Sequence, residues 1–475
     1  MRSFIEGMPK AELHVHLEGT LEPEHIFALA QRNGIELEYK SPQDVIDAYN
    51  FHDLPSFLTI YYAAMGVLRE EQDFYELTYQ YFEKVAAENV LYVEPFFDPQ
   101  AHTSRGVEFA TVIDGIHRAQ ADAETNLGVK SNLIMCFLRD LSAESAMEHL
   151  EMAVPYLDRI VGVGLDSDEK DNPPLKFAGV FKRAREHGLK LTMHCDVNQK
   201  DIGAHMWECL NDIKVDRIDH GVNSLEDEAM CDEIAKRGLG LTVCPVSNRF
   251  VVQSLTANEI RTMLNKGMKA TVNSDDPAYF RAYMNDNFIA LQEEGDFSRD
   301  EIVQLSRNAF EVAWIDEAQR KRLLQTLDDY VTEMGRSGSN PEIDISFDDS
   351  LEVSEVVDLY AANEWSSAEK PDELVAALRN SHSMVTARVQ GKLVGIANAI
   401  SDGHLVVYYP HLLVHPDNQG QGIGRRIMLA MGEKYGGFHQ QMLTADADSV
   451  GFYKTMGFET AGKTVPMWIY GGNDH

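Results

Sequence analysis

Short apolar runs rich in β-branched residues alternate with longer amphipathic segments along the first two thirds of this sequence. Strand-like runs surround the pair His14 and His16 and recur at residues 90–97, 132–138, 160–166, 190–196, 217–221, 240–248 and 269–276. Segments with apolar residues at helical spacing lie between them, at residues 54–87, 108–127, 176–187 and 226–237. Eight strands separated by helices predict an α/β fold, a parallel (β/α)8 barrel of the TIM type.

The end of this pattern also fits a barrel, because helices at residues 301–314 and 317–334 would close it. An open doubly wound sheet remains the alternative. Such a sheet normally carries a Gly-rich turn after its first strand, and His16-Leu-Glu-Gly-Thr20 is not such a turn.

Composition changes at Gly335-Arg-Ser-Gly-Ser-Asn-Pro341, a stretch of small, polar and helix-breaking residues. Stretches of this kind are typical of domain boundaries. We therefore predict a first domain of residues 1–334, a linker of residues 335–342 and a smaller second domain of residues 343–475. The length of 475 residues, too long for one typical core, agrees with two domains.

Charge and cysteine content narrow the functional classes. Acidic residues outnumber basic ones by 76 to 42, a formal net charge of −34 that repels nucleic acids and anionic membranes. The five cysteines form no Cys-x-x-Cys pair and leave one over, which argues against a disulfide framework. The N-terminus lacks the apolar stretch of a signal peptide, and no run is long enough to span a membrane. We expect a cytoplasmic protein. The sequence leaves open whether it forms a homo-oligomer.

Polar residues gather where a parallel barrel places its chemistry, at the carboxyl ends of the predicted strands. On a strand, His14 and His16 would project from the same face and could grip one metal ion. The polar residues at the ends of the first, fifth, sixth and eighth strands are His14, His16, His194, His220, Asp275 and Asp276. Three histidines and a carboxylate at one barrel mouth predict a metal site.

Each of these residues also has an ordinary structural explanation. His194 could be a hydrogen-bonded core histidine, His220 could cap a helix, and Asp275 or Asp276 could begin a helix before Pro277. Their joint placement favours zinc, which lowers the pKa of a bound water molecule so that hydroxide is available at neutral pH. His220, which is left over after the ligands, would then take the proton.

Four motifs resemble those of the adenosine/adenine deaminase family of the amidohydrolase superfamily, in the same order and over most of residues 8–334. The motifs are Pro9-Lys-Ala-Glu-Leu-His-Val-His-Leu-Glu-Gly19, Arg217-Ile-Asp-His-Gly221, Cys244-Pro-Val-Ser-Asn248 and Asn273-Ser-Asp-Asp-Pro277. The resemblance implies that His14, His16, His194 and Asp275 bind zinc and that His220 orients and deprotonates the water. It also implies that Asp276 hydrogen-bonds a purine ring nitrogen.

Two features resemble the members that act on a free base. Glu18 stands where the nucleoside enzymes of the family usually carry a ribose-contacting aspartate, and it would shorten the ribose pocket. The stretch Gly164-Leu-Asp-Ser-Asp-Glu169, with Ser167 as an expected substrate contact, is similar to the adenine deaminase form of the fourth-strand motif.

One departure from the family concerns the acid that protonates the purine ring. The family normally reads His-Ala-Gly-Glu at the fifth strand, whereas this chain reads His194-Cys-Asp-Val197. Valine cannot donate a proton, so Asp196 could substitute, the relay could be rerouted, or the substrate could be another aminopurine.

The last part of the chain carries a different pattern. An apolar strand at residues 411–414 is followed by Gln419-Gly-Gln-Gly-Ile-Gly424 and a helix, which suits binding of a pyrophosphate. With Gly451-Phe-Tyr-Lys-Thr-Met-Gly-Phe458 it resembles the GNAT family of acetyl-CoA-dependent N-acetyltransferases, which have an α+β fold. The resemblance implies that Gln419, Gly420, Gly422 and Gly424 bind the coenzyme A pyrophosphate and Val414 the pantetheine. Tyr453 would protonate the departing thiolate; the alternative is a packing aromatic beside Phe452.

These observations favour a bifunctional enzyme. We expect a zinc-dependent aminopurine deaminase, acting on adenine or on adenosine or another modified aminopurine, fused to an acetyltransferase of unknown acceptor. The alternative is an acetyltransferase that carries a catalytically silent, purine-binding barrel. Ammonia release from adenine would separate the two.

Overall fold

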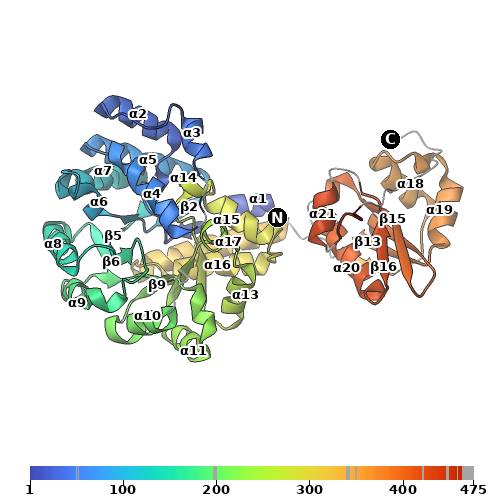
Figure 1. The fold of residues 1–475 in the computed structure, drawn as a ribbon. Coiled ribbons are helices and arrows are strands. Elements are labelled where there is room, and N and C mark those ends of the chain that lie inside the picture. Colours follow the sequence, from blue (N-terminus) through green and yellow to red (C-terminus); the bar gives the residue numbers. More distant parts are fainter. Residues whose placement is uncertain are drawn as a thin grey trace. The chain divides into compact units, whose positions relative to one another are not determined.

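The structure is a computed structural model that describes residues 1–49, 51, 53–195, 201–337, 343–347, 350–419, 422–445, 449–456 and 458–462. The chain divides into two compact units, one of Arg2–Thr332 and one of Glu333–His475 together with Met1. Both units are drawn in Figure 1. No helix in the described part of the chain combines the length and the apolar character needed to cross a membrane.

The first unit is built from parallel strands, which lie at its centre while the helices lie around them (Figure 1). The strands are β1 (Lys10–Glu12), β2 (Val90–Val93), β3 (Phe96–Phe97), β4 (Lys130–Ser131), β5 (Leu133–Leu138), β6 (Ile160–Asp166), β7 (Lys190–Leu191), β8 (His194–Cys195), β9 (Arg217–His220), β10 (Gly240–Val243) and β11 (Lys269–Val272). They pair in the orders β1-β2-β4, β3-β5-β6-β7 and β8-β9-β10-β11.

Two isolated parallel bridges complete the ring. Val15 pairs with Asp275 and His16 pairs with Phe96, so the residues after β1 lie between the ends of β11 and β3. Several predicted strands consist of two short pieces, such as β2 with β3 and β7 with β8. The predicted parallel barrel is confirmed.

The barrel helices follow the amphipathic segments. They are α1 (Arg2–Gly7), α2 (Pro23–Asn33), α3 (Pro42–Asp47), α4 (Leu54–Ala64), α5 (Glu71–Ala87), α6 (Pro99–Thr103), α7 (Phe109–Leu127), α8 (Ala143–Ala153), α9 (Ala178–Glu186), α10 (Ile202–Glu208), α11 (Glu228–Arg237), α12 (Pro245–Val251), α13 (Ala257–Asn265), α14 (Pro277–Phe280), α15 (Met284–Glu293), α16 (Arg299–Val312) and α17 (Glu317–Ser337). Short 3-10 turns η1 (Glu18–Thr20), η2 (Met65–Val67), η3 (Val154–Tyr156), η4 (Pro174–Phe177) and η6 (Val222–Glu226) and the π-helical turn η5 (Cys209–Ile213) connect them.

Three predicted boundaries differ from the structure. The strand predicted at residues 240–248 ends at Val243, because Pro245 occupies the first turn of α12, where proline favours a helix start. The strand predicted at residues 269–276 ends at Val272, before the irregular segment that carries Asp275. The segment 54–87 is interrupted by η2, which separates α4 from α5.

The predicted linker also starts too early. Residues 335–337 belong to the last turn of α17, which runs to Ser337. A single Gly costs a helix only about 1 kcal/mol, which a helix of 21 residues tolerates near its end. The other linker positions, 338–342, lie outside the described residues.

The second unit contains a five-stranded sheet in the order β12 (Ile343–Ser346), β13 (Ser383–Val389), β14 (Lys392–Ser401), β15 (Val406–Val414) and β16 (Gln440–Leu443). All neighbours are antiparallel except β15 and β16, which run parallel. Strands β13 and β14 are joined at Gln390 and Gly391, both with positive φ. The other elements are α18 (Val353–Ala362), η7 (Ser366–Glu369), α19 (Pro371–Arg379), η8 (Pro416–Asn418), α20 (Ile423–Tyr435) and α21 (Val450–Thr455).

Candidate active site

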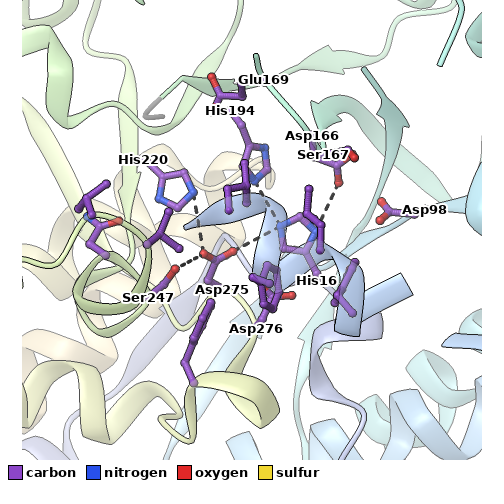
Figure 2. A pocket seen from close by; sticks show the side chains of 18 of the residues that line it. His16, Asp98, Asp166, Ser167, Glu169, His194, His220, Ser247, Asp275 and Asp276 are labelled. Atoms are coloured by element: carbon purple, nitrogen blue, oxygen red, sulfur yellow. Dashed lines mark hydrogen bonds and ion pairs between the residues drawn. The ribbon is translucent and has the colours of Figure 1, made fainter. Parts of the chain in front are cut away.

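A pocket opens at the carboxyl ends of the barrel strands. Most of its polar lining comes from strand ends, and its apolar lining comes mainly from α4 and α12 (Figure 2). The lining residues are His16, Leu54, Phe57, Leu58, Tyr61, Tyr62, Asp98, Asp166, Ser167, Glu169, His194, His220, Ser247, Asn248, Val251, Val252, Asp275, Asp276 and Phe280. Apolar walls with a few convergent polar groups are typical of ligand sites.

Three imidazoles and one carboxylate converge beside this pocket. His14 Nε2 lies 3.1 Å from Asp275 Oδ1, and His16 Nε2 lies 3.4 Å from the same oxygen. His16 Nε2 also lies 3.2 Å from His194 Nε2. Adjacent donors of a tetrahedral zinc ion with bonds of 2.0–2.1 Å lie about 3.3 Å apart, so the spacing of this donor set fits zinc.

The opposite ring nitrogens of two of these histidines are already engaged. His14 Nδ1 lies 2.9 Å from Thr242 Oγ1, and His194 Nδ1 donates to the carbonyl oxygen of Leu165 at 3.1 Å. A hydrogen bond at one ring nitrogen fixes the ring and directs the lone pair of the other nitrogen toward a metal. The surrounding fold therefore orients His14 and His194 as Nε2 ligands.

Electrostatics agree with this donor set. Burial lowers the pKa of His14 to about 4 and that of His194 well below its ordinary value, which keeps both imidazoles neutral, as ligands must be. Burial alone would lower the pKa of His16, yet the carboxylates of Asp276 and Asp275 raise it to about 10. The site therefore stabilises a positive charge at this point, which a bound cation can supply.

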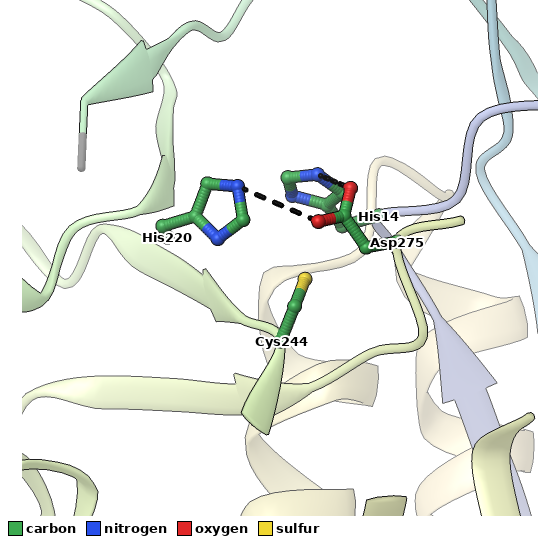
Figure 3. Close-up of side chains that lie close together, drawn as sticks. All are labelled: His14, His220, Cys244 and Asp275. Atoms are coloured by element: carbon green, nitrogen blue, oxygen red, sulfur yellow. Dashed lines mark hydrogen bonds and ion pairs between the residues drawn. The ribbon is translucent and has the colours of Figure 1, made fainter. Parts of the chain in front are cut away.

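A second donor set shares two of these residues. Figure 3 shows His14, His220, Cys244 and Asp275 close together, with His220 Nε2 3.9 Å from Asp275 Oδ2. Burial raises the pKa of the Cys244 thiol well above its ordinary value, and the thiol donates to the carbonyl oxygen of Thr242. A metal requires a thiolate, so this set fits a cation less well than the three imidazoles do.

The two aspartates after β11 differ in their surroundings. Asp275 Oδ2 accepts a hydrogen bond from Ser247 Oγ at 2.6 Å, whereas Asp276 Oδ1 is buried and has no hydrogen-bond partner among the described residues. A Cβ atom added to Gly19 would lie 2.1 Å from Asp276 Oδ1 and 2.8 Å from its Cα. The glycine after Glu18 therefore allows the close approach that positions Asp276.

Backbone strain gathers at the pocket. His220, Asp275 and Ser167 have φ values of 59°, 66° and 72°, in the left-handed region that residues other than glycine rarely adopt. Each such residue costs about 1–3 kcal/mol, and such strain clusters at functional sites. The strain is thus a further sign that these strand ends are shaped for a ligand.

Glu18 and Ser167, the two residues expected to favour a free base, are placed differently. Ser167 lines the pocket and accepts a hydrogen bond from the Tyr62 hydroxyl at 2.8 Å. Glu18 is buried behind the lining, where its carboxylate lies 2.8 Å from His102 Nε2 and accepts from the Asp98 backbone N–H. It is not one of the residues that line the pocket.

Several site residues were missed by reading the sequence. Asp98, Asp166 and Glu169 line the pocket, and Asp219 is buried behind it, 3.8 Å from the Nδ1 atoms of both His14 and His194. Asp166 and Asp219 end or nearly end β6 and β9, so the rule that located the histidines could have located them too. Val197, which stands where the family carries its acid, and Asp196, which could replace that acid, lie outside the described residues.

The second unit carries the other predicted site. Gly422 caps α20 with a φ of 74°, and Gln419 Nε2 donates to the Val414 carbonyl oxygen at 3.0 Å. A Cβ atom added to Gly424 would come within 3.7 Å of both Val414 and Phe452. Tyr453, on α21, is half-buried and its ring lies 5.0 Å from that of Phe452. Gly420 lies outside the described residues.

The sheet opens beside these residues. Pairing between β15 and β16 covers only Val406 to Tyr409, where Tyr409 pairs with Leu443. The following β15 residues, from Pro410 to Val414, have no paired strand on that side in the described part of the chain. A free strand edge next to the start of α20 can accept an extended ligand.

Comparison with known proteins gives a consistent result for both units. Residues 9–330 match the family model "Adenosine deaminase", and residues 352–467 match the model "Acetyltransferase (GNAT) domain". The chain is 50% identical over 326 residues to an adenine deaminase of Acinetobacter baylyi, covering 68% of this chain and 98% of that protein. It is 46% identical over 333 residues to an adenine deaminase of Hahella chejuensis, covering 70% of this chain and 99% of that protein.

A solved structure supports the same relationship. The adenine deaminase of Arthrobacter aurescens superposes with a TM-score of 0.67 and 42% sequence identity, covering 69% of this chain and all of that one. An amidohydrolase from Burkhoderia ambifaria with bound zinc, 25% identical, superposes with a TM-score of 0.64, covering 70% and 94%. The chain belongs to the adenosine deaminase family and carries a GNAT acetyltransferase domain after its barrel.

Proposed function

We propose that the first unit is a zinc-dependent deaminase of a free aminopurine, with adenine converted to hypoxanthine and ammonia. The observation that carries this proposal is the convergence of His14, His16, His194 and Asp275, with donor spacings that fit zinc, beside the pocket at the strand ends. The adenine deaminases among the relatives support the choice of substrate.

The residues would divide the work as follows. Zinc in this donor set would acidify a water molecule, the nucleophile that hydrolytic deamination needs. His220 would accept the proton of the water as it adds to C6, because its Nε2 lies beside Asp275, 3.9 Å from Oδ2. Asp276 would hydrogen-bond a purine ring nitrogen through the buried oxygen that no described residue pairs. The apolar residues of α4 would exclude bulk water from the bound base.

The charge of the pocket supports an unphosphorylated substrate. The described lining includes five acids, Asp98, Asp166, Glu169, Asp275 and Asp276, and none of the described lining residues is a lysine or an arginine. Phosphate groups are bound in proteins mainly by arginine, lysine and helix N-termini. The phosphate of a nucleotide would therefore find neither arginine nor lysine in the described lining, whereas a free base needs neither.

We further propose that the second unit, residues 343–475 in the sequence interpretation, binds acetyl-CoA. Gln419, Gly420, Gly422 and Gly424 would hold the pyrophosphate at the start of α20, and the free edge of β15 near Val414 would hold the pantetheine. Tyr453 would protonate the departing thiolate. Gly422→Asp should abolish acetyl-CoA binding in calorimetry. The aspartate would put a negative charge where the pyrophosphate must approach, and its side chain would strain a backbone with positive φ.

The deaminase proposal is tested by ammonia release from adenine, adenosine and AMP with the purified full-length chain. Adenine should be the preferred substrate, and Asp196→Asn should slow its turnover by about 10²–10⁴-fold if Asp196 supplies the ring proton. If no aminopurine is deaminated and Val197→Glu restores nothing, the barrel is silent and the proposal is wrong.

A further inference from the structure

Two buried carboxyl groups form a part of the pocket that the reaction described above does not use. Asp98 follows β3 and Asp166 ends β6, and their side chains are only 1% and 3% exposed. Both line the pocket, on the side of His16 that faces away from Asp275 (Figure 2). One carboxylate oxygen of each and a ring nitrogen of His16 lie within 4.8 Å of one another.

The hydrogen bonds of this pair are incomplete. Asp166 Oδ2 lies 3.4 Å from His16 Nδ1, within ion-pair distance but without a hydrogen bond. Oδ1 of Asp166 and Oδ1 of Asp98 are buried, and neither has a hydrogen-bond partner among the described residues. A buried acceptor without a donor is costly, so two of them in one pocket point to a ligand that supplies an N–H or O–H group.

The rest of the pocket limits what that ligand can be. The described lining holds five acids and neither lysine nor arginine, so a ligand that brings its own N–H or O–H donor fits it. A free purine base carries an N–H at N9, the atom that holds the sugar in a nucleoside. In adenine this N–H lies on the far side of the ring system from the amino group at C6. A base whose C6 faces His220 and Asp275 would therefore direct its N9–H away from them.

We propose that Asp98 and Asp166 accept the N9–H of the free purine base and so make the barrel select the base over its nucleoside. This inference rests on the proposed deaminase function and extends it to a specificity site. Sites that hydrogen-bond a substrate N–H reject analogues that lack it far more strongly than apolar pockets reject an extra methylene. The pair thus supplies the discrimination that Glu18, behind the pocket wall, does not supply by direct contact.

Asp98 is the better residue to vary. Asp166 also contacts His16, whereas the side chain of Asp98 makes no capping hydrogen bond to α6, which it precedes. The contact from Asp98 to Glu18 comes from its backbone N–H, which any substitution other than proline keeps. Asp98→Ala should therefore fold, and Asp98→Asn keeps the shape and one oxygen acceptor.

The test compares adenine with its isostere in which sulfur replaces the N9–H group, so that no bulk is added. We expect the wild type to prefer adenine by about 10²-fold or more in kcat/KM. Asp98→Ala should lower kcat/KM for adenine by about 10–100-fold, mostly through KM, and leave the isostere unchanged, with Asp98→Asn in between. Calorimetry with hypoxanthine should show the same loss of affinity. The exposed Asp212→Ala serves as the matched control and should change neither substrate.

Two results would overturn the inference. If Asp98→Ala still prefers adenine to the sulfur isostere as strongly as the wild type does, the Asp98 carboxyl group does not accept a hydrogen bond from N9–H. A second equivalent of metal in the wild type that is lost in Asp98→Ala would assign the pair to a cation. A wild type that turns over neither compound would refute the deaminase proposal instead, and the binding of hypoxanthine would then decide on the carboxyl pair separately.

Discussion

The two ends of the barrel bury charged groups in different ways. At the amino-terminal end of β9, Arg217 is fully buried, forms an ion pair with Glu94 and stacks on the Trp314 ring at 4.1 Å. At the carboxyl-terminal ends, by contrast, three imidazoles, several carboxylates and strained backbone converge on a pocket, and oxygens of Asp98, Asp166 and Asp276 have no described hydrogen-bond partner. The ion pair of Arg217 and Glu94 stabilises the fold, whereas the oxygens of Asp98, Asp166 and Asp276 are placed to bind a ligand. Variants at the two ends should therefore fail in different assays.

The largest effect is expected at the mouth. His14→Ala or His194→Ala removes one of four metal ligands, so bound zinc should fall well below one per chain and deaminase activity by at least about 10³-fold. Elemental analysis and ammonia release measure both. His404→Ala, at an exposed histidine of the second unit, is the control and should retain metal and activity. Stoichiometric zinc in both ligand variants would contradict the site.

A stability effect is expected at the opposite end. Glu94→Ala removes the closer of two carboxylates that face the buried Arg217, whose Nε also lies 3.8 Å from Asp219 Oδ1. Loss of this buried ion pair should lower the free energy of unfolding by about 3–5 kcal/mol. Denaturant unfolding measures this loss. The fraction that remains folded should keep its zinc and its kcat/KM, because Glu94 does not line the pocket. A selective loss of kcat/KM without a loss of stability would break the distinction between the two ends.

A smaller effect on activity is expected from Gly19→Ala. The added Cβ would collide with Asp276, including its backbone Cα at 2.8 Å, so Asp276 must shift. We expect kcat/KM to fall by about 10–100-fold, since a displacement of about 1 Å can cost this much, while the metal stays bound. Gly66→Ala is the matched control, because its Cβ would meet nothing within 4 Å. Equal activity of the two alanine variants would contradict the positioning role of Gly19.

In the second unit we expect a change in how stability depends on pH. Burial lowers the pKa of His411 to about 4, and its Nδ1 lies 2.7 Å from the Tyr360 hydroxyl. Between pH 6.5 and 4 the unfolded chain binds a proton here and the folded chain does not, so stability should fall as the pH falls through this window. His411→Asn should remove up to about 3 kcal/mol of this dependence in unfolding measured at pH 7.5 and pH 4.5. An unchanged pH dependence in His411→Asn would show that His411 does not cause it. The control His404→Asn, at an exposed histidine, should leave the pH dependence unchanged.

The sequence predicted the barrel and the metal-facing residues for one reason. Alternating strands and helices define which end of each strand meets the others, so His14, His16, His194 and Asp275 could be placed together from their positions alone. The same rule applied to every strand end would have added Asp166 and Asp219. The ends of the strands predicted at residues 90–97 and 160–166 were not considered in this way, and so the pair Asp98 and Asp166 was missed.

Other features could not be derived from local sequence. Glu18 turns to His102, 84 positions further along the chain, and a pattern within one strand gives no sign of such a contact. Helix α17 extends through Gly335 because a helix end depends on the free energy of the whole helix and not on one residue. The parting of β15 and β16 depends on the sheet as a whole, which the glycines near Gly422 do not encode.

We propose that His14, His16, His194 and Asp275 hold the zinc ion on which adenine deamination depends. To test this directly, metal is removed from the full-length chain with a chelator, and ammonia release from adenine is followed while zinc is added back. We expect no turnover without metal and a rise in turnover that saturates at one zinc per chain. Full activity in the metal-free protein, or saturation that His14→Ala leaves unchanged, would contradict it.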